Sequence, residues 1–408
     1  MNLPELLSPA GTFEALDAAL RFGANAVYLG LDACNLRSGA GNFTTDDLPD
    51  VFEKASETGA KIYITLNAMP FDAQLPQVEA MLDRIRISGI LPNAFIVSDP
   101  GVIRLCRRIL PAAELHLSTQ TGVFNAESLA FWKDEGISRV VLPREMSLDQ
   151  IIALVKQDIL PLEIFCHGAM CMAISGRCLM GAYMYGRHPN QGDCPQPCRF
   201  SYSVNPVSTG RDGEGIAIDI EEDGEATYLM NSKDLCALPI LDKLVKSGIV
   251  SLKIEGRNRS AQYVAAATRI YRSALDAIAS EGNLWSMRQE WVDELNAIDH
   301  REYTTGFFCG ETAMQDRAVN RRPASLRVAG VVKAIDGCDA IVDVKNGFNN
   351  GADLSLLPIT LKKGVRIVKI NSLRDFGGRE LTRAKTNSLV RVTNDSFREG
   401  DILRVAAS

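Results

Sequence analysis

The sequence contains no uninterrupted apolar run of 18 residues or more, so we expect no membrane-spanning helix. Its first residues, MNLPELLSPAG, lack a basic segment followed by a long apolar one, so we expect no secretory signal peptide. Neither an H-E-x-x-H nor a G-x-S-x-G motif occurs, which removes the usual signatures of zinc proteases and serine hydrolases. We therefore expect a cytoplasmic protein in a reducing compartment, where clustered cysteines are more often metal ligands or catalytic groups than disulfides.

Charge is unevenly distributed along the 408 residues. The whole chain has a formal net charge of −6, which argues against indiscriminate binding of nucleic acid. Residues 325–408 carry 14 Lys and Arg against 9 Asp and Glu, whereas residues 1–324 carry 30 against 41. A basic tail on an acidic body indicates that a polyanionic partner would bind at the C-terminal end. A solvated basic face without a partner explains the same count.

Short apolar runs of β-forming residues alternate with helical patterns from the start of the chain. The predicted strands are Leu3–Leu7, Ala26–Gly30, Lys61–Leu66, Ala94–Val97, Glu114–Leu117, Arg139–Leu142, Leu162–Cys166 and Val250–Ile254. The helices predicted between them are Phe13–Phe22, Asp46–Thr58, Leu75–Ile87, Val102–Leu110, Ala126–Glu135 and Leu148–Gln157, the last opening with a capping box at Ser147. Eight strands with intervening helices predict an α/β fold, a parallel (β/α)8 TIM-like barrel, with an open doubly wound sheet as the alternative.

The remainder of the chain divides around this barrel. We predict that the barrel spans residues 1–313, with a cysteine-rich loop at 166–200 after the seventh strand and a helical extension near its end. The Gly- and acid-rich segment 204–226 has the composition of an exposed hairpin or insertion. Residues 314–324 fit a linker, and short β runs in 325–408 predict a small, basic, all-β barrel domain.

Polar residues follow the predicted strands repeatedly. In a barrel the carboxyl ends of the strands meet on one face, where active sites are built. The polar residues at these ends are Ser8, Asn67, Ser98, Asp99, Ser118, Gln120, Arg144, His167, Glu255 and Arg257. We expect them to converge, although any one of them could simply mark a loop.

Four cysteines of the 166–200 loop are spaced C-x6-C-x15-C-x3-C, at Cys171, Cys178, Cys194 and Cys198. Zinc ribbons normally use two tight C-x2-4-C pairs, and only one tight pair is present. Iron–sulfur clusters need four thiolates and accept looser spacing. Zinc and buried structural or redox thiols remain the alternatives, and Cys236 could supply a substitute ligand.

A fifth cysteine, Cys166, ends the seventh predicted strand. With a period of two, Glu163, Phe165 and His167 would share one face, while Ile164 and Cys166 would share the other. Cys166 and His167 are thus badly placed to form a nucleophile–base pair. We expect Cys166 to be a core thiol.

The chain resembles peptidase family U32, whose signature reads E-x-F-x2-G-[SA]-[LIVM]-C-x4-G-x-C-x-[LIVM]-S. The match runs from Glu163 to Met180, and Gly181 replaces the final serine. Further matching segments are ELLSPAG, GANAVYLG, HLSTQ, PNQGDCPQPCR, YLMNSKDL, SLKIEGR and HREYTTGFF. Together they cover nearly the whole predicted barrel.

The resemblance is greatest to the bacterial tRNA hydroxylation members of the family. It implies a [4Fe–4S] cluster on Cys171, Cys178, Cys194 and Cys198, and hydroxylation of C5 of the wobble uridine in tRNA. It also implies a link to prephenate, and so a small dicarboxylate near the cluster, and dependence on iron–sulfur assembly machinery. Hydroxylation of 23S rRNA and the peptidase activity of the family name are the alternatives.

Residue roles follow from this resemblance and from the predicted strand ends. Cationic donors there suit a carboxylate, and the unstacked bases of an anticodon loop suit aromatic side chains. The catalytic candidates are His167, Arg177, Lys253, Glu255 and Arg257. The substrate-binding candidates are Arg37, Asn67, Ser118, Gln120 and Tyr183, with Tyr185 and Phe200 as further stacking partners.

Overall fold

The computed structural model describes residues 2–36, 41–202, 221–222, 227–228, 232–310, 322–358, 364–394 and 396–407. Its larger part is a closed barrel of parallel strands, because the eighth barrel strand pairs with both the seventh and the first. The barrel strands are β1 (Glu5–Ala10), β2 (Ala26–Gly30), β3 (Lys61–Leu66), β4 (Ala94–Val97), β5 (Leu115–Leu117), β6 (Arg139–Val141), β7 (Leu162–Ala169) and β12 (Ser251–Ile254). The predicted TIM-like barrel is confirmed, and the open sheet is excluded.

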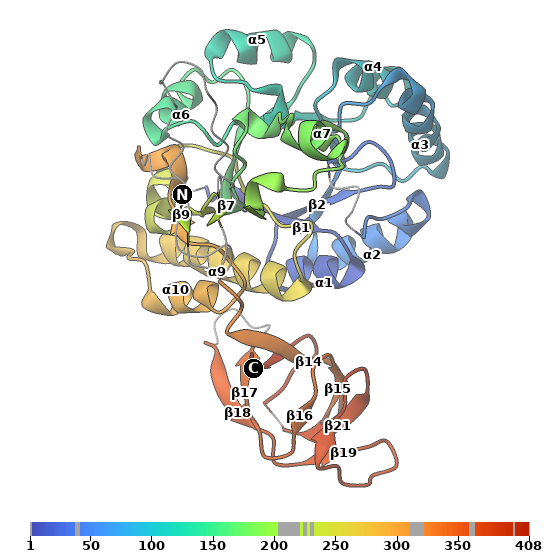
Figure 1. Cartoon of the computed structure of the whole chain (residues 1–408), viewed down its shortest axis with the longest axis vertical. Coiled ribbons are helices and arrows are strands. Elements are labelled where there is room, and N and C mark those ends of the chain that lie inside the picture. The colour runs from blue at the N-terminus through green and yellow to red at the C-terminus, as the bar shows by residue number, and fades with distance from the viewer. Residues whose placement is uncertain are drawn as a thin grey trace, which may run out of the picture.

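Helices surround the strands (Figure 1). They are α1 (Phe13–Arg21), α2 (Leu48–Thr58), α3 (Leu75–Ser88), α4 (Pro100–Ile109), α5 (Ala126–Asp134), α6 (Leu148–Val155), α8 (Leu241–Lys246), α9 (Ala261–Glu281) and α10 (Gln289–Asn296). Several begin at a side chain that accepts a hydrogen bond from the first turn, as at Thr12, Asp99 and Ser260. The capping box at Ser147 and Gln150 is confirmed. None of the helices in the described part of the chain is long and apolar enough to cross a membrane.

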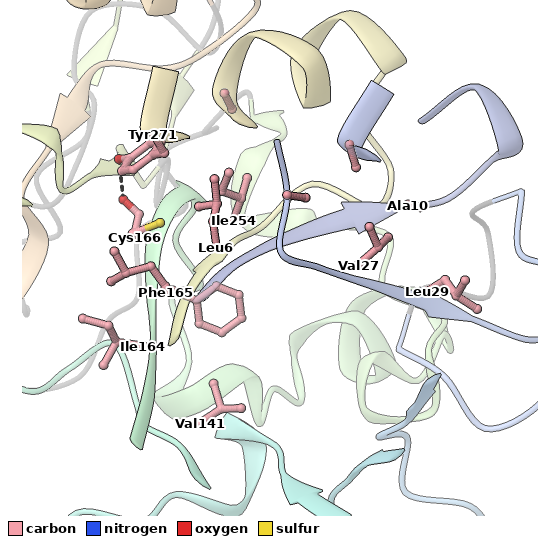
Figure 2. Packing of buried hydrophobic residues seen from close by; sticks show 14 of the residues in the cluster. Leu6, Ala10, Val27, Leu29, Val141, Ile164, Phe165, Cys166, Ile254 and Tyr271 are labelled. Atoms are coloured by element: carbon pink, nitrogen blue, oxygen red, sulfur yellow. Dashed lines mark hydrogen bonds between the residues drawn. The ribbon is translucent and has the colours of Figure 1, made fainter. Parts of the chain in front are cut away.

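The main core lies between the strands and the helices (Figure 2). Strand residues such as Leu6, Val27 and Ile254 are fully buried there. The Tyr271 hydroxyl of α9 donates to the Cys166 carbonyl oxygen at 2.8 Å and so ties this helix to β7. Cys166 has no exposed surface, and its thiol donates to the Lys253 carbonyl oxygen at 3.4 Å. The prediction of a core thiol is confirmed.

Strand β7 contains an irregularity that the sequence pattern did not indicate. Lys253 of β12 pairs with Phe165, but the next residue, Ile254, pairs with His167, so β7 has an extra residue at this point. Such a bulge reverses the alternation of faces. His167 therefore turns outward and lies against the rings of Tyr263 and Tyr271, with 1% of its surface exposed. The prediction that His167 shares the face of Phe165 is wrong.

Two short strands extend the sheet beyond the barrel at this edge. Strand β11 (Asp234–Cys236) runs antiparallel to the end of β7, and β13 (Tyr303–Thr304) runs parallel to β11. The sequence analysis predicted neither. The predicted insertion 204–226 lies mostly outside the described residues, but the short strands β8 (Ser201–Tyr202), β9 (Glu221–Glu222) and β10 (Thr227–Tyr228) form a small antiparallel sheet.

A second, antiparallel β domain follows and forms a half-barrel with a core of its own, which confirms the predicted all-β domain. Its strands are β14 (Leu326–Asp336), β15 (Asp339–Val344), β16 (Phe348–Asn349), β17 (Asp353–Leu357), β18 (Arg366–Lys369), β19 (Leu373–Arg374), β20 (Arg383–Ala384), β21 (Leu389–Thr393) and β22 (Ile402–Ala406). Most of the predicted linker lies outside the described residues, so the boundaries at 313 and 325 stay predictions.

The β domain packs beside α1, α9 and α10 (Figure 1). At the centre of the contact the fully buried Arg404 of β22 pairs with Glu294 of α10, with one nitrogen to oxygen distance of 3.0 Å. The Gln262 amide donates to the Leu326 carbonyl oxygen at 3.0 Å, and Arg269 donates to the Pro358 carbonyl oxygen at 3.3 Å. These bonds fix the β domain against the barrel.

Candidate functional site

A cavity of about 430 Å³ lies at the carboxyl ends of the barrel strands, beneath the cysteine-rich loop. The loop contains the short helix α7 (Met180–Tyr185) and supplies one wall, while residues that follow β3, β5, β6 and β12 supply the other. The four predicted ligands, Cys171, Cys178, Cys194 and Cys198, all line this cavity. The loop thus covers the face on which barrel enzymes carry their active sites.

Three of the thiols affect the pKa of the fourth, Cys198. Burial raises the pKa of the Cys198 thiol above its ordinary value, the Arg199 guanidinium opposes this, and Cys171, Cys194 and Cys178 raise it further. They are therefore neighbours around one region of the cavity. Within the described chain, no group of three or more His, Cys, Asp or Glu side chains is placed to hold a metal ion. Four thiols around one cavity are the type of donor that an iron–sulfur cluster requires, and the cluster itself stays a prediction.

The loop is held in place by a few specific contacts. The Asn190 amide group bonds to both the N–H and the carbonyl oxygen of Cys178, at 3.2 and 3.3 Å. Met69 donates its N–H to the Asn190 carbonyl oxygen at 2.9 Å and so joins the loop to the segment after β3. Arg199 and Ser232 both donate to the Met170 carbonyl oxygen, at 3.3 and 2.9 Å.

Gly192 lies where the loop approaches the segment after β2, and we expect Gly192→Ala to weaken this contact. Its φ is +96°, and an added Cβ would lie 2.2 Å from the Asn35 carbonyl oxygen. We expect a loss of more than about 1 kcal/mol in the free energy of unfolding, measured by denaturant titration. Gly186→Ala is the control, because Gly186 also has a positive φ, +63°, but no atom within 4 Å of an added Cβ. Equal losses in the two variants would show that the close approach is unimportant.

Most of the predicted polar site residues line the same cavity as the cysteines. They are Asn67, Ser118, Gln120, Arg177, Lys253, Glu255 and Arg257. The rule that strand ends converge therefore located this wall correctly. Arg144, after β6, also lines the cavity, as expected of a strand-end residue, although no role was predicted for it. Glu145 and Tyr28 line the cavity too and were not named by the sequence analysis.

Three cationic side chains in the cavity are held by short contacts. The Arg257 guanidinium, on a residue 5% exposed, donates to Thr65 Oγ1 at 2.8 Å and to Asn35 Oδ1 at 2.9 Å. Arg177 Nε donates to the Gln120 carbonyl oxygen at 2.6 Å. The Arg144 guanidinium lies 3.7 Å from the centre of the Phe165 ring and 3.7 Å from a Glu255 carboxylate oxygen. Preorganised cations of this kind suit the binding of carboxylates.

The model of Peptidase family U32 matches residues 11–318. The chain belongs to this family. The tRNA hydroxylation protein P1 of Bacillus subtilis is 34% identical over 386 residues, which cover 94% of this chain and 89% of that protein. The tRNA hydroxylation protein P of Helicobacter pylori is 40% identical over 310 residues, which cover 75% of this chain and 72% of that protein.

A solved structure of the family is also similar. The structure of the U32 peptidase Mk0906 is 12% identical, with a TM-score of 0.39, and covers 63% of this chain and 94% of that chain. Within the family signature, this chain has Gly181 where serine is usual. An added Cβ there would lie 2.8 Å from Pro189 Cγ and 2.9 Å from Pro195 Cδ, so the loop packs too closely here for a side chain.

Two predicted residues do not lie in the cavity of this U32 family member. Outward-facing His167 is not among its lining residues, and burial lowers the pKa of its imidazole to about 3, so the ring is neutral. Tyr183, on α7, is 87% exposed and lies outside the lining. Arg37 lies outside the described residues. The possible substitute ligand Cys236 is buried on β11 beside the Tyr271 hydroxyl, 3.8 Å away.

Proposed function

We propose that this protein is an iron–sulfur-dependent tRNA hydroxylase that acts at C5 of the wobble uridine, with a prephenate-like dicarboxylate as a further ligand. The observation that carries the proposal is the convergence of four cysteines and a set of cationic strand-end residues on one cavity. Homology to tRNA hydroxylation proteins over most of the chain supports the choice of substrate.

Cys171, Cys178, Cys194 and Cys198 would hold the [4Fe–4S] cluster, which iron–sulfur assembly machinery would supply. When bound, the cluster would pass electrons or activate the oxygen-donating species. Burial raises the pKa of the Cys198 thiol, and the adjacent Arg199 guanidinium opposes this rise and so works toward the thiolate that ligation requires.

The chain's own residues would bind and orient the small ligand. Arg257 and Arg177 each keep a fixed guanidinium in the cavity wall, and Lys253 lies at its floor. Such donors bind the two carboxylates of a dicarboxylate. Glu255, paired with Arg144, is the carboxylate placed to accept or return a proton at the reacting base.

RNA would bind across the cysteine-rich loop. The loop carries Arg177, Arg187 and Arg199 but only one carboxylate, Asp193, although residues 1–324 as a whole are acidic. The ring centres of Tyr185 and Phe200 lie 5.7 Å apart, and both rings are partly exposed. The Tyr183 side chain is more exposed than either. Exposed rings beside cations form a platform on which unstacked bases bind. The basic β domain would contact phosphates farther along the tRNA.

The test is nucleoside mass spectrometry of tRNA from a strain that lacks the gene. We expect 5-hydroxyuridine and its derivatives to disappear and to return when the intact gene is restored. The strain should also lack any second pathway to the same nucleoside. Unchanged tRNA nucleosides would contradict the proposal, and a loss confined to 23S rRNA nucleosides would transfer it to ribosomal RNA.

The same cavity gives little support to proteolysis. Among the described residues that line it there is no histidine, so it offers no Ser–His or Cys–His pair. Thiolates that ligate iron are also unavailable as nucleophiles.

We expect the anaerobically purified protein to be brown, to carry iron and sulfide, and to leave gelatin intact.

A further inference from the structure

A chain of charged side chains runs through the interior of the barrel, below the cavity. Lys253 Nζ lies 3.2 Å from Glu163 Oε1, and Glu163 Oε2 lies 3.2 Å from a nitrogen of Arg139. The same Arg139 nitrogen lies 2.7 Å from Glu5 Oε1. Lys253 is 4% exposed and Glu163 is fully buried. This row of ion pairs therefore crosses the barrel, with one residue from each of the strands β12, β7, β6 and β1.

The two ends of this row of ion pairs reach different openings of the barrel. Lys253 lines the candidate active-site cavity, whereas Arg139 and Glu5 line an opening at the amino ends of the strands. Barrel interiors are usually filled by branched apolar side chains, and replacing a buried ion pair by apolar residues is often neutral or stabilising. Stability alone therefore gives no reason for these charges.

We infer that Glu163 is a positioning residue that holds Lys253 as an ammonium ion at the floor of the cavity, where it binds a carboxylate of the small ligand, and that Arg139 shares the charge of Glu163. The inference deepens the proposed function and rests on the cavity being its ligand site. Lys253 Nζ lies 4.4 Å from the centre of the Tyr28 ring and 5.4 Å from that of Phe165. These rings fix the direction of the ammonium group and exclude water from its sides.

The charged groups around Lys253 act in opposite directions. Burial lowers the pKa of Lys253, Glu163 and then Glu255 raise it, and Arg257 lowers it. On the other side of Glu163, Lys253 and Arg139 hold the pKa of that carboxyl below its ordinary value against the effect of burial. His116 of β5 faces the same network, and burial lowers its pKa to about 3, so it is neutral. Glu163 is thus the main group that keeps Lys253 protonated.

Glu163→Gln removes the charge that raises the pKa of Lys253 and leaves burial and Arg257 unopposed except by Glu255. The variant lysine should therefore lose its proton at lower pH than the wild-type lysine. Arg139→Gln should act the other way, because the charge of Glu163 would no longer be shared. Glu5→Gln is the matched control, since Glu5 bonds to Arg139 and Tyr63 but not to Lys253.

The experiment is trace acetylation with acetic anhydride between pH 6 and pH 10, with the Lys253 peptide quantified by mass spectrometry. Only the neutral amine reacts, and one pKa unit changes its amount tenfold at pH values below the pKa. We expect about tenfold faster labelling of Lys253 in Glu163→Gln at pH 8, slower labelling in Arg139→Gln, and no change in Glu5→Gln. Succinate, the dicarboxylate probe, should protect Lys253 in the wild type and less in Glu163→Gln.

Circular dichroism of each variant checks that it is folded. Glu163→Gln and Arg139→Gln should shift the Lys253 titration in opposite directions, so the test stays decisive if one of them unfolds. Identical titration of Lys253 in all the folded variants would overturn the positioning role. Failure of succinate to protect the wild type would overturn the carboxylate site. Neither result depends on tRNA hydroxylation, so failure of the proposed function would be seen separately, in the nucleosides of the deletion strain.

Discussion

Replacing any one of Cys171, Cys178, Cys194 or Cys198 by serine should remove most of the iron from the anaerobically purified protein. Each cysteine would ligate one iron, so we expect the content to fall from about four irons per chain to fewer than about one. Hydroxylated uridine in tRNA should disappear with it when the variant is the only copy of the gene in the cell. Iron and sulfide analysis, the visible absorption spectrum and tRNA nucleoside mass spectrometry measure these effects.

Exposed cysteines outside the cavity provide the controls. Cys309 and Cys338 are exposed and do not line the cavity, so Cys309→Ser and Cys338→Ser should keep both iron and activity. A similar thermal unfolding midpoint in all variants would show that the loss is local. The cluster assignment fails if a cavity variant keeps its iron. Iron retained with loss of modification would instead make that cysteine catalytic rather than a ligand.

The barrel was predictable because each of its strands is a short apolar run between helical patterns. β2, β3 and β4 begin and end at the predicted residues. β1 lies two to three residues later than predicted, where it pairs Ser8 with Val27 and Pro9 with Tyr28. Pairing with neighbours decides where a strand stops, and a single sequence does not contain this information.

The site was predictable as far as strand ends alone determine it. Asn67, Ser118 and Arg257 were located by this rule, and the position of the cysteines after the seventh strand placed their loop over the same face. His167 was wrong because one extra residue in β7 reverses the side-chain alternation, and the pairing register that creates it depends on β12. Glu163 was recognised only as part of a motif, since its two cationic partners come from other strands.

The contact between the two domains involves long-range pairs that no local pattern indicates. Arg404 and Glu294 are 110 residues apart, and each lies in an element whose own pattern is unremarkable. Their pairing matters for function, because the proposed tRNA contacts of the β domain require a fixed position relative to the cavity. Loss of the pair should therefore reduce stability and weaken RNA binding together.

Glu294→Ala should be among the most destabilising single changes in the described chain. Arg404 has no exposed surface, and its guanidinium bonds to Glu294 and, at 2.9 Å, to the Ser355 hydroxyl. Removing the carboxylate leaves a buried cation without its counter-ion, which typically lowers the free energy of unfolding by about 3–5 kcal/mol. Urea unfolding followed by circular dichroism measures the loss, and the β domain should unfold at lower urea than the barrel.

Two further variants separate the effect of the unpaired Arg404 charge from that of simple loss of contact area. Glu294→Met combined with Arg404→Met removes both charges and should recover most of the stability, because apolar replacements of a buried pair are often neutral or better. The exposed pair Arg21–Glu399 also joins the domains, and Glu399→Ala should cost less than about 1 kcal/mol, since solvent screens such pairs. If the double variant is no more stable than Glu294→Ala, the unpaired charge is not the cause. If it recovers but binds tRNA more weakly than the wild type, the ion pair sets the orientation of the β domain rather than its stability.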